Sequence, residues 1–166
     1  MQLVICSDIH DNIWALDRAL ADMPKEDTTL LFCGDFCAPF TLVQLAEGFP
    51  GPIHAVWGNN DGDKWLLTAQ AARFPQVNLH GELAEFECGG RSIRANHYPQ
   101  IARRLAEAGG VDLVCYGHDH VAHEEVLPNG VHLINPGELM GRFGRCSYRV
   151  VDLDSMEQRL ETFDRL

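Results

Sequence analysis

Short clusters of aspartate, histidine and asparagine, side chains that bind divalent metal ions, recur along this 166-residue chain. Each follows an apolar run, and together they contain Asp8, His10, Asp35, Asn59, His118 and His120. Asp8 and His10 are separated only by Ile9, so an extended backbone would point both side chains to the same side. His118 and His120 repeat this spacing. The residue types and their spacing therefore predict a metal centre.

One further histidine, His97, follows an apolar strand pattern of its own and completes a set of seven candidate ligands. Seven ligands are too many for one tetrahedral site and suit two ions with five or six ligands each. Oxygen and imidazole ligands without thiolate favour manganese, iron, zinc or nickel over calcium or copper. We expect two divalent ions, with manganese as the first choice and nickel, zinc or iron(II) as alternatives.

The apolar runs before the clusters predict the strands that must position them. They lie at 2–6, 28–33, 53–57 and 112–116. A near-continuous apolar run is typical of a strand buried on both faces, as in α/β sheets. Ligands of open α/β sheets bind at the carboxyl ends of the strands. The clusters should therefore converge on one spot.

The remaining pattern predicts helices over 13–22, 40–47, 63–72 and 100–108. Further strands are expected at 77–80, 83–88, 91–96, 122–127, 131–135, 146–153 and 158–164. The first part alternates strands and helices, which favours a parallel sheet, and the later part consists mainly of hairpins. In the third helix Trp65, Leu66 and Ala69 should face inward, and Trp14 should pack its helix against the sheet. We predict two packed sheets with helices outside.

Length and composition predict a single domain over 1–166, without the roughly 20-residue apolar run of a membrane span. The amino terminus lacks the features of a signal peptide. Six cysteines without a CxxC pair indicate the reducing cytoplasm, with a redox-active Cys33/Cys37 pair as an alternative. The net charge of −11 argues against nucleic-acid binding. A homo-oligomer remains open.

The clusters, in this order, resemble the motifs of the calcineurin-like metallophosphoesterases, and most of all the small single-domain bacterial and archaeal phosphodiesterases. The resemblance spans residue 3 to about residue 142. It implies a four-layer α/β/β/α sandwich of two mixed sheets flanked by helices. It also implies that one ion is held by Asp8, His10, Asp35 and His120. The other would be held by Asp35, Asn59, His97 and His118, with Asp35 bridging the two.

The sequence departs from the family pattern at Asn60, where many relatives carry the histidine that protonates the leaving group. Asparagine has no titratable proton, and general acid catalysis is typically worth about 10²–10⁴-fold. We therefore expect a preference for good leaving groups, such as aryl or nucleotidyl esters. Asn12, Asn60 and Arg142 are candidate substrate contacts. Arg145 is either a further one or, like Arg142, a solvated loop charge.

These observations predict a dinuclear metal-dependent phosphodiesterase or phosphatase that hydrolyses small phosphate esters. Two ions about 3.5–4 Å apart would share a hydroxide that attacks phosphorus. The predicted catalytic residues are Asp35, Asn59, Asn60 and His97. The alternative is a non-catalytic scaffold of the same fold, against which the retained ligand set argues. His54, His80, His123 and His132 are predicted to be structural.

Overall fold

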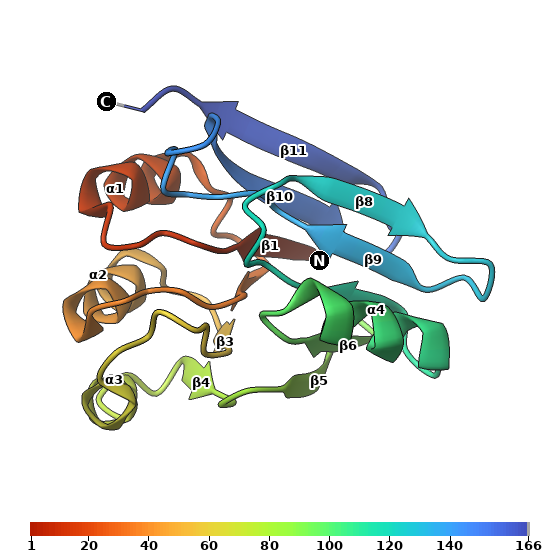
Figure 1. Cartoon of the computed structure of the whole chain (residues 1–166), viewed down its shortest axis with the longest axis horizontal. Helices are drawn as coiled ribbons and strands as arrows, with labels where there is room; N and C mark the ends of the chain where they lie inside the picture. The colour runs from red at the N-terminus through yellow and green to blue at the C-terminus, as the bar shows by residue number, and fades with distance from the viewer. Residues whose placement is uncertain (166) are drawn as a thin grey trace.

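The computed structural model describes residues 1–165, which form two β-sheets packed face to face between helices (Figure 1). The first sheet has the strand order β11-β10-β1-β2-β3-β4. Its strands are β1 (Gln2–Cys6), β2 (Thr28–Phe32), β3 (Ile53–Ala55), β4 (Val77–Leu79), β10 (Cys146–Asp152) and β11 (Gln158–Phe163). Strands β1 to β4 are parallel, and β10 and β11 add antiparallel pairs. The sheet is therefore mixed, with a parallel half that carries most of the predicted ligands.

The second sheet has the order β5-β6-β7-β9-β8. Its strands are β5 (Ala84–Cys88), β6 (Arg91–Ala95), β7 (Leu113–Cys115), β8 (His123–Val126) and β9 (His132–Asn135). Strands β6, β7 and β9 are parallel, whereas β5 and β8 pair antiparallel at the two edges. Both sheets are thus mixed, as the sequence predicts.

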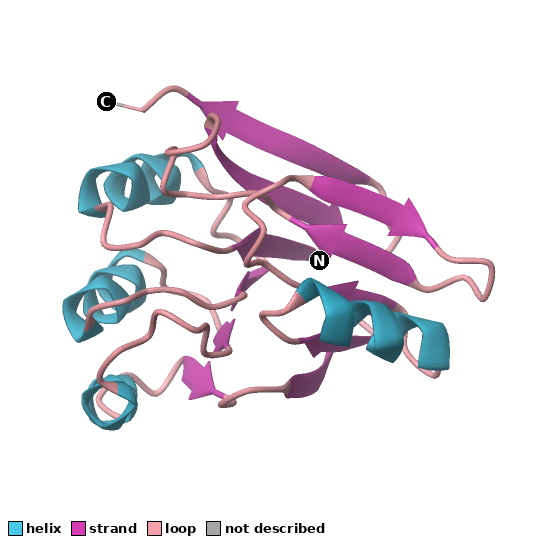
Figure 2. Ribbon diagram, viewed as in Figure 1, coloured by secondary structure: helices cyan, strands magenta, loops and turns pink. Residues whose placement is uncertain are grey.

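Helices form the two outer layers (Figure 2). They are α1 (Ile13–Asp22), α2 (Pro39–Gly48), α3 (Lys64–Ala71) and α4 (Pro99–Ala108). Asn12 and Asp63 cap α1 and α3 by accepting hydrogen bonds from backbone N–H groups of the first turn. Helices α2 and α4 begin at proline, which lacks the N–H that a helix start leaves unpaired. None of the described helices is long and apolar enough to cross a membrane.

Three apolar clusters separate the four layers. Along β1 the side chains alternate, so that Val4 packs with α1 to α3 whereas Leu3 packs between the sheets. The third cluster contains Ala102 of α4 and Val114 of β7. Because the central strands β1, β2 and β7 are buried on both faces, the apolar strand runs have the physical origin that the sequence suggested. The predicted α/β/β/α sandwich is confirmed.

The predicted inward face of the third helix is wrong. Trp65 is 80% exposed, Ala69 is also exposed and Leu66 is only half-buried. Leu67 and Ala71 are buried instead, four residues apart on the face toward the sheet. Hydrophobicity alone assigned the larger side chains to the interior, whereas in the folded chain α3 packs into the apolar cluster through Leu67 and Ala71.

Trp14 also differs from its prediction, since it is 65% exposed at the start of α1. Ala15 and Leu16 fill the interface with the sheet instead. The strands before the predicted ligands are shorter than expected: β3 ends at Ala55 and β7 at Cys115. The residues that follow make no further strand pairs and form the loops that carry the candidate ligands.

Candidate metal centre

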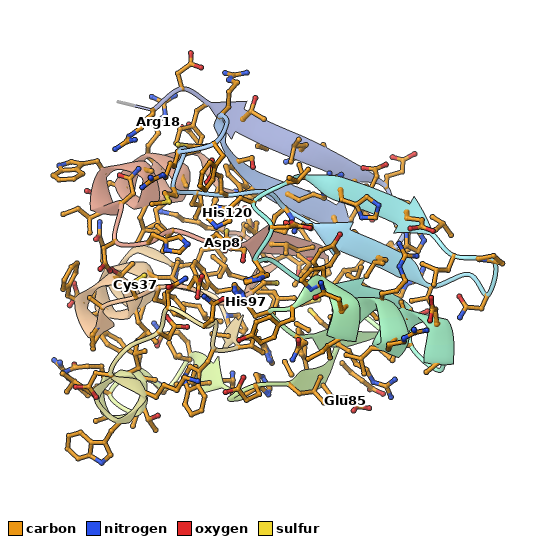
Figure 3. The ribbon with its side chains drawn as sticks, in the orientation of Figure 1. Asp8, Arg18, Cys37, Glu85, His97 and His120 are labelled. Carbon is orange, nitrogen blue, oxygen red and sulfur yellow. The ribbon has the colours of Figure 1, made fainter. Side chains whose placement is uncertain are left out.

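The seven predicted ligands gather where strands of both sheets end. Asp8, Asp35 and Asn59 follow the parallel strands β1, β2 and β3, whose carboxyl ends share one edge. His97 follows β6, and the histidine pair His118 and His120 follows β7. In Figure 3 the labelled Asp8, His97 and His120 lie together in the middle of the molecule, whereas Glu85 lies at its periphery. The fold thus brings residues more than 100 positions apart into one site.

Two groups of three ligands share Asp8. One is Asp8 with His10 and His120, the other is Asp8 with Asp35 and His97, and in each the ligand atoms lie within 4.8 Å of one another. The Nε2 atoms of His10 and His97 are both 3.4 Å from Asp35 Oδ2. His120 Nε2 is 3.4 Å from Asp8 Oδ1. Both carboxylates therefore lie between imidazoles, a position from which one carboxylate can serve two ions.

The amide of Asn59 extends this constellation toward the second sheet. Its Oδ1 lies 3.1 Å from His97 Nε2 and 2.8 Å from His118 Nδ1. Asn59 Oδ1 therefore lies within contact of both imidazoles. His118 presents Nδ1 here rather than Nε2, and its side chain is exposed, so this part of the centre faces solvent.

Two buried ligand atoms fit a bound cation. Among the described residues, Asp8 Oδ1 and His10 Nε2 are buried and have no hydrogen-bond partner. Leaving a buried polar atom unpaired costs about 1–3 kcal/mol, and more for a charged group. A divalent ion would satisfy both atoms at once. The donor set of carboxylate, imidazole and amide oxygen therefore fits a divalent metal ion.

The backbone at the site is unusual. Asp8, His10, Asp35, His118 and His120 all have positive φ angles, between 44° and 75°. Non-glycine residues rarely adopt this conformation, and such residues cluster at functional sites. The prediction that an extended backbone aligns each alternating pair is therefore wrong. Tight turns after the strands, rather than strand alternation, bring these side chains together.

Two glycines allow the loops to approach the carboxylates. A Cβ added to Gly58 would collide with Asp35 Oδ1, and one added to Gly117 would collide with Ser7 Oγ. The close approach at Gly117 lets the backbone N–H of His118 donate to Asp8 Oδ2 at 3.0 Å. Glycine before Asn59 and before His118 is thus required by packing around the ligands.

Carboxylates and imidazoles perturb each other in the centre. Burial alone would raise the pKa of Asp35, but hydrogen bonds from His97 and Asn60 outweigh it and hold the pKa well below its usual range. The nearby Asp8 carboxylate, with Asp35, outweighs burial and raises the pKa of His10. Burial opposes the charge on His97, yet the Asp35 carboxylate raises its pKa above the ordinary value. Such mutual attraction marks a site built to hold positive charge.

The predicted substrate contacts lie in different settings. Asn60 donates from its backbone and its amide to the two oxygens of Asp35, each at 2.8 Å. Asn12 caps α1 through Oδ1 and donates from Nδ2 to the Met140 carbonyl at 2.9 Å. Arg142 is exposed, with its guanidinium 5.5 Å from the centre of the Phe143 ring.

Arg145, by contrast, pairs with Asp164 at 2.9 Å and donates to Thr162 of β11. Its guanidinium is therefore engaged at the edge of the first sheet. Substrate binding by Asn12, Asn60 and Arg142 stays a prediction.

Asp61 is a positioning residue that sequence reasoning missed. It is buried, and its Oδ2 accepts from the N–H groups of Gly58 and Asp35 while Oδ1 accepts from Cys37 at 2.9 Å. One carboxylate thereby orders the loops after both β2 and β3. The sequence feature that could have indicated this role is its place in Gly58-Asn59-Asn60-Asp61, because aspartate in a turn commonly accepts hydrogen bonds from nearby backbone N–H groups.

Cys37 lies beside the centre, in contact with one of the candidate ligands. Its Sγ is 3.4 Å from His10 Nδ1. Burial, together with nearby carboxylates, raises the pKa of the Cys37 thiol to about 12. All six cysteines are free, Cys33 among them.

Glu138 is the second residue that was missed. It is buried, and its Oε2 lies 2.7 Å from His120 Nδ1. A lone glutamate after the Asn135-Pro136-Gly137 turn gave no signal in the sequence, because its contact with His120 exists only in the folded chain.

Comparison with known proteins identifies the family of this chain. The family model of the calcineurin-like phosphoesterase superfamily domain matches residues 1–156. Phosphodiesterase MJ0936 of Methanocaldococcus jannaschii is 29% identical over 164 residues, covering 96% of this chain and 97% of that protein. The match therefore extends over essentially the whole of both proteins.

Solved structures give the same result. The structure described as a novel archaeal phosphodiesterase superposes with a TM-score of 0.90 at 26% identity, covering 98% of this chain and all of the other. Vps29 of Chaetomium thermophilum shares the fold with a TM-score of 0.69 at 14% identity, over 98% of this chain and 95% of that one. The chain belongs to the calcineurin-like phosphoesterase superfamily and is a metal-dependent phosphoesterase.

Proposed function

We propose that this protein is a dinuclear phosphodiesterase that hydrolyses small phosphate esters with good leaving groups. The observation that carries the proposal is the cluster of Asp8, His10, Asp35, His97 and His120, in which Asp8 Oδ1 and His10 Nε2 are buried and unpaired. Asn59 joins this cluster through His97 and also contacts His118. The similarity to phosphodiesterase MJ0936 over nearly the full length of both chains supports a diester as the substrate.

The side chains divide into two overlapping sets. Asp8, His10, Asp35 and His120 would hold one ion. Asp35, Asn59, His97 and His118 would hold the other. When bound, two divalent ions would lower the pKa of water and neutralise the charge on the phosphoryl oxygens. Manganese is the first candidate, with nickel, zinc or iron(II) as alternatives, because the ligands are oxygen and imidazole.

Asn60 stands where a proton donor to the leaving group would be expected, and it has a different role here. Its amide donates to Asp35 Oδ2 and holds that carboxylate in place. It offers no titratable proton to a departing oxygen, so the leaving group must depart without that help. Aryl diesters tolerate this, because their leaving phenolate oxygens are weakly basic. Arg142, which is exposed and lies over the ring of Phe143 beside His120, would bind a phosphate oxygen.

The alternative, a non-catalytic binding module, is not favoured. Such a module has no requirement for buried ligand atoms without partners or for a cluster of positive φ angles at the predicted ligands. The structural likeness to Vps29 concerns the fold alone. Retention of the complete ligand set favours a working centre.

The test is hydrolysis of bis-p-nitrophenyl phosphate by metal-stripped protein, with Mn²⁺, Ni²⁺, Zn²⁺ or Mg²⁺ added back. Activity should return with at least one ion and be lost in Asp35→Asn and His97→Ala. Asp17→Asn, a change on the exposed face of α1, is the matched control and should keep activity. Absence of hydrolysis with every ion would favour the non-catalytic binding module.

A series of diesters tests the leaving-group preference. The rate should fall steeply from aryl to simple alkyl diesters, because no general acid compensates for a more basic leaving oxygen. Asn60→His offers a titratable group at this position and should reduce the difference in rate between aryl and alkyl diesters. Comparable rates on both classes in the unaltered protein would contradict the assignment of Asn60.

A further inference from the structure

We propose that Glu138 is a positioning residue that holds His120 in the tautomer able to bind metal through Nε2, and that it couples this ligand to the loop carrying Phe143. The inference rests on the proposed function in one respect, that His120 binds a cation. It concerns a residue outside the seven ligands and the predicted substrate contacts.

The side chain of Glu138 makes contacts in two directions. The residue is 1% exposed, and its Oε2 lies 2.7 Å from His120 Nδ1. Its Oε1 accepts hydrogen bonds from the backbone N–H groups of Phe143 at 2.6 Å and Gly144 at 3.0 Å. An ionised carboxylate only accepts, so the proton at this contact must sit on His120 Nδ1. The lone pair of Nε2 is then free, 3.4 Å from Asp8 Oδ1.

The backbone of Glu138 is fixed on both sides. Its carbonyl accepts from the N–H of Ser147 in β10 at 2.8 Å. The next two residues, Leu139 and Met140, donate to the carbonyls of Ser7 and Asp8 at 3.0 and 2.9 Å. Glu138 is therefore anchored to the same segment that supplies the Asp8 carboxylate. Its position relative to the metal centre is set by the sheet rather than by a mobile loop.

Gly137 makes this placement possible. Its φ is +83°, and a Cβ added there would collide with Ser147 Oγ. The turn before Glu138 thus presses against β10 and directs the carboxylate back toward His120.

The ring of His120 is held on three sides. Glu138 fixes its Nδ1 edge, the His10 ring stacks against it with centroids 5.1 Å apart, and the Phe143 ring meets it edge-on at 5.2 Å. Phe143 is 73% exposed, so its position depends on its backbone rather than on burial. The bond from Phe143 N–H to Glu138 supplies that restraint. Orientation of the ligand and order of the loop therefore depend on one carboxylate.

Replacement of Glu138 by glutamine gives a sharp test, because the amide cannot satisfy both sides. If its oxygen accepts from Phe143 and Gly144, its NH₂ group faces His120 and donates to Nδ1. The proton then moves to Nε2, the atom needed for the metal. If the amide flips, its NH₂ group meets two backbone donors and the loop is released. Either arrangement weakens the site without changing the volume of the side chain.

The first measurement uses metal-free protein, so it is independent of catalysis. Nitrogen-15 NMR of the imidazoles should show His120 protonated at Nδ1 in the unaltered protein at neutral pH. In Glu138→Gln this signature should shift toward the Nε2-protonated form, or the amide signals of Phe143 and Gly144 should broaden. Glu87→Gln, on an exposed position of β5, removes the same charge and should leave both unchanged. An unchanged His120 tautomer together with an unchanged loop in Glu138→Gln would overturn the proposal.

The second measurement is Mn²⁺ affinity by titration. Loss of a partner behind a metal-binding histidine typically weakens affinity about 10–100-fold. We expect a loss of this size in Glu138→Gln and none in Glu87→Gln. In a His120→Ala background, Glu138→Gln should cause little further loss, because the two residues act as one unit.

Equal additional loss in both backgrounds would mean that Glu138 acts on overall stability and not through His120. Unaltered protein that binds no metal ion would refute the proposed function itself. Unaltered protein and Glu138→Gln that bind Mn²⁺ equally would refute only the role of Glu138.

Discussion

Two groups of histidines in this protein have opposite chemistry. At the metal centre, carboxylates raise the pKa of His10 and His97. Between β3 and β4, His54 Nδ1 lies 2.8 Å from His80 Nε2, and the His54 ring stacks on Phe86 with centroids 3.7 Å apart. Burial, reinforced by His80, lowers the pKa of His54 to about 4. Burial also lowers the pKa of His80.

The comparison shows that the neighbours of a histidine, rather than its burial, decide its role. Both groups contain partly buried imidazoles, and burial disfavours their charged form in each case. At the metal centre the carboxylates of Asp8 and Asp35 outweigh that penalty and create a site for positive charge. His54 and His80 contact each other, and His54 stacks on Phe86, so nothing offsets the burial that lowers both pKa values; we expect a structural role for this pair.

The largest expected effect is on phosphodiesterase activity, which should fall after a substitution at the metal centre but not after one in the His54–His80 pair. Asp35→Asn removes a candidate ligand that lies 3.4 Å from both His10 and His97 and should lower phosphodiesterase activity by more than about 100-fold, beyond the effect of losing an outer partner. His54→Gln, the control from the structural pair, should retain activity. The measurement is the initial rate on bis-p-nitrophenyl phosphate with saturating Mn²⁺. Comparable losses of activity in both variants would contradict the distinction between the metal centre and the His54–His80 pair.

The second prediction concerns the stabilisation that metal gives. An ion that binds only the folded chain at 100 times its dissociation constant adds about 2.7 kcal/mol of stability. For a domain of this size that corresponds to roughly 5–10 °C in Tm. Thermal unfolding should show this rise on adding Mn²⁺ to the unaltered protein and to His80→Gln, and a smaller rise in His10→Ala. An equal rise in His10→Ala would exclude His10 as a ligand.

The third prediction is the pH dependence of metal binding. Because the pKa values of His10 and His97 are raised, both imidazoles hold protons at higher pH than ordinary histidines. Metal must displace these protons, so affinity should fall as pH drops through the raised pKa values, about tenfold per pH unit for each proton displaced. Mn²⁺ titrations from pH 8 to pH 5.5 measure this slope. His54→Gln should leave the slope unchanged, and a flat profile in the unaltered protein would contradict the assignment.

The smallest effect is the acid sensitivity of the structural pair. The pKa of His54 is about 4 when folded, against an ordinary value of 6.5, so the unfolded chain binds more protons between these values. Stability from this pair is therefore complete above pH 6.5 and falls as pH decreases toward 4. Partial exposure limits the loss to about 1 kcal/mol. Urea midpoints of metal-free protein at pH 7.5 and 4.5 should differ less in His54→Gln, and an identical pH response would refute the neutral pair.

The fold was largely predictable because it rests on local patterns, and the same patterns indicated which candidate ligands lie at the strand ends. Apolar runs indicated strands buried on both faces, and each run is followed by a candidate ligand such as Asp8 or Asn59. The face of α3 was not predictable from hydrophobicity, because packing against the sheet buries Leu67 and leaves the larger Trp65 exposed.

The sequence by itself determined which side chains are present at the strand ends, since residue type and strand pattern are local properties. Only the tertiary structure decided how they meet. Positive φ angles in the loops, the close approach at Gly117 and the carboxylate of Glu138 behind His120 all depend on contacts between distant segments. A local sequence pattern cannot show such contacts, because they form only when both sheets have packed together.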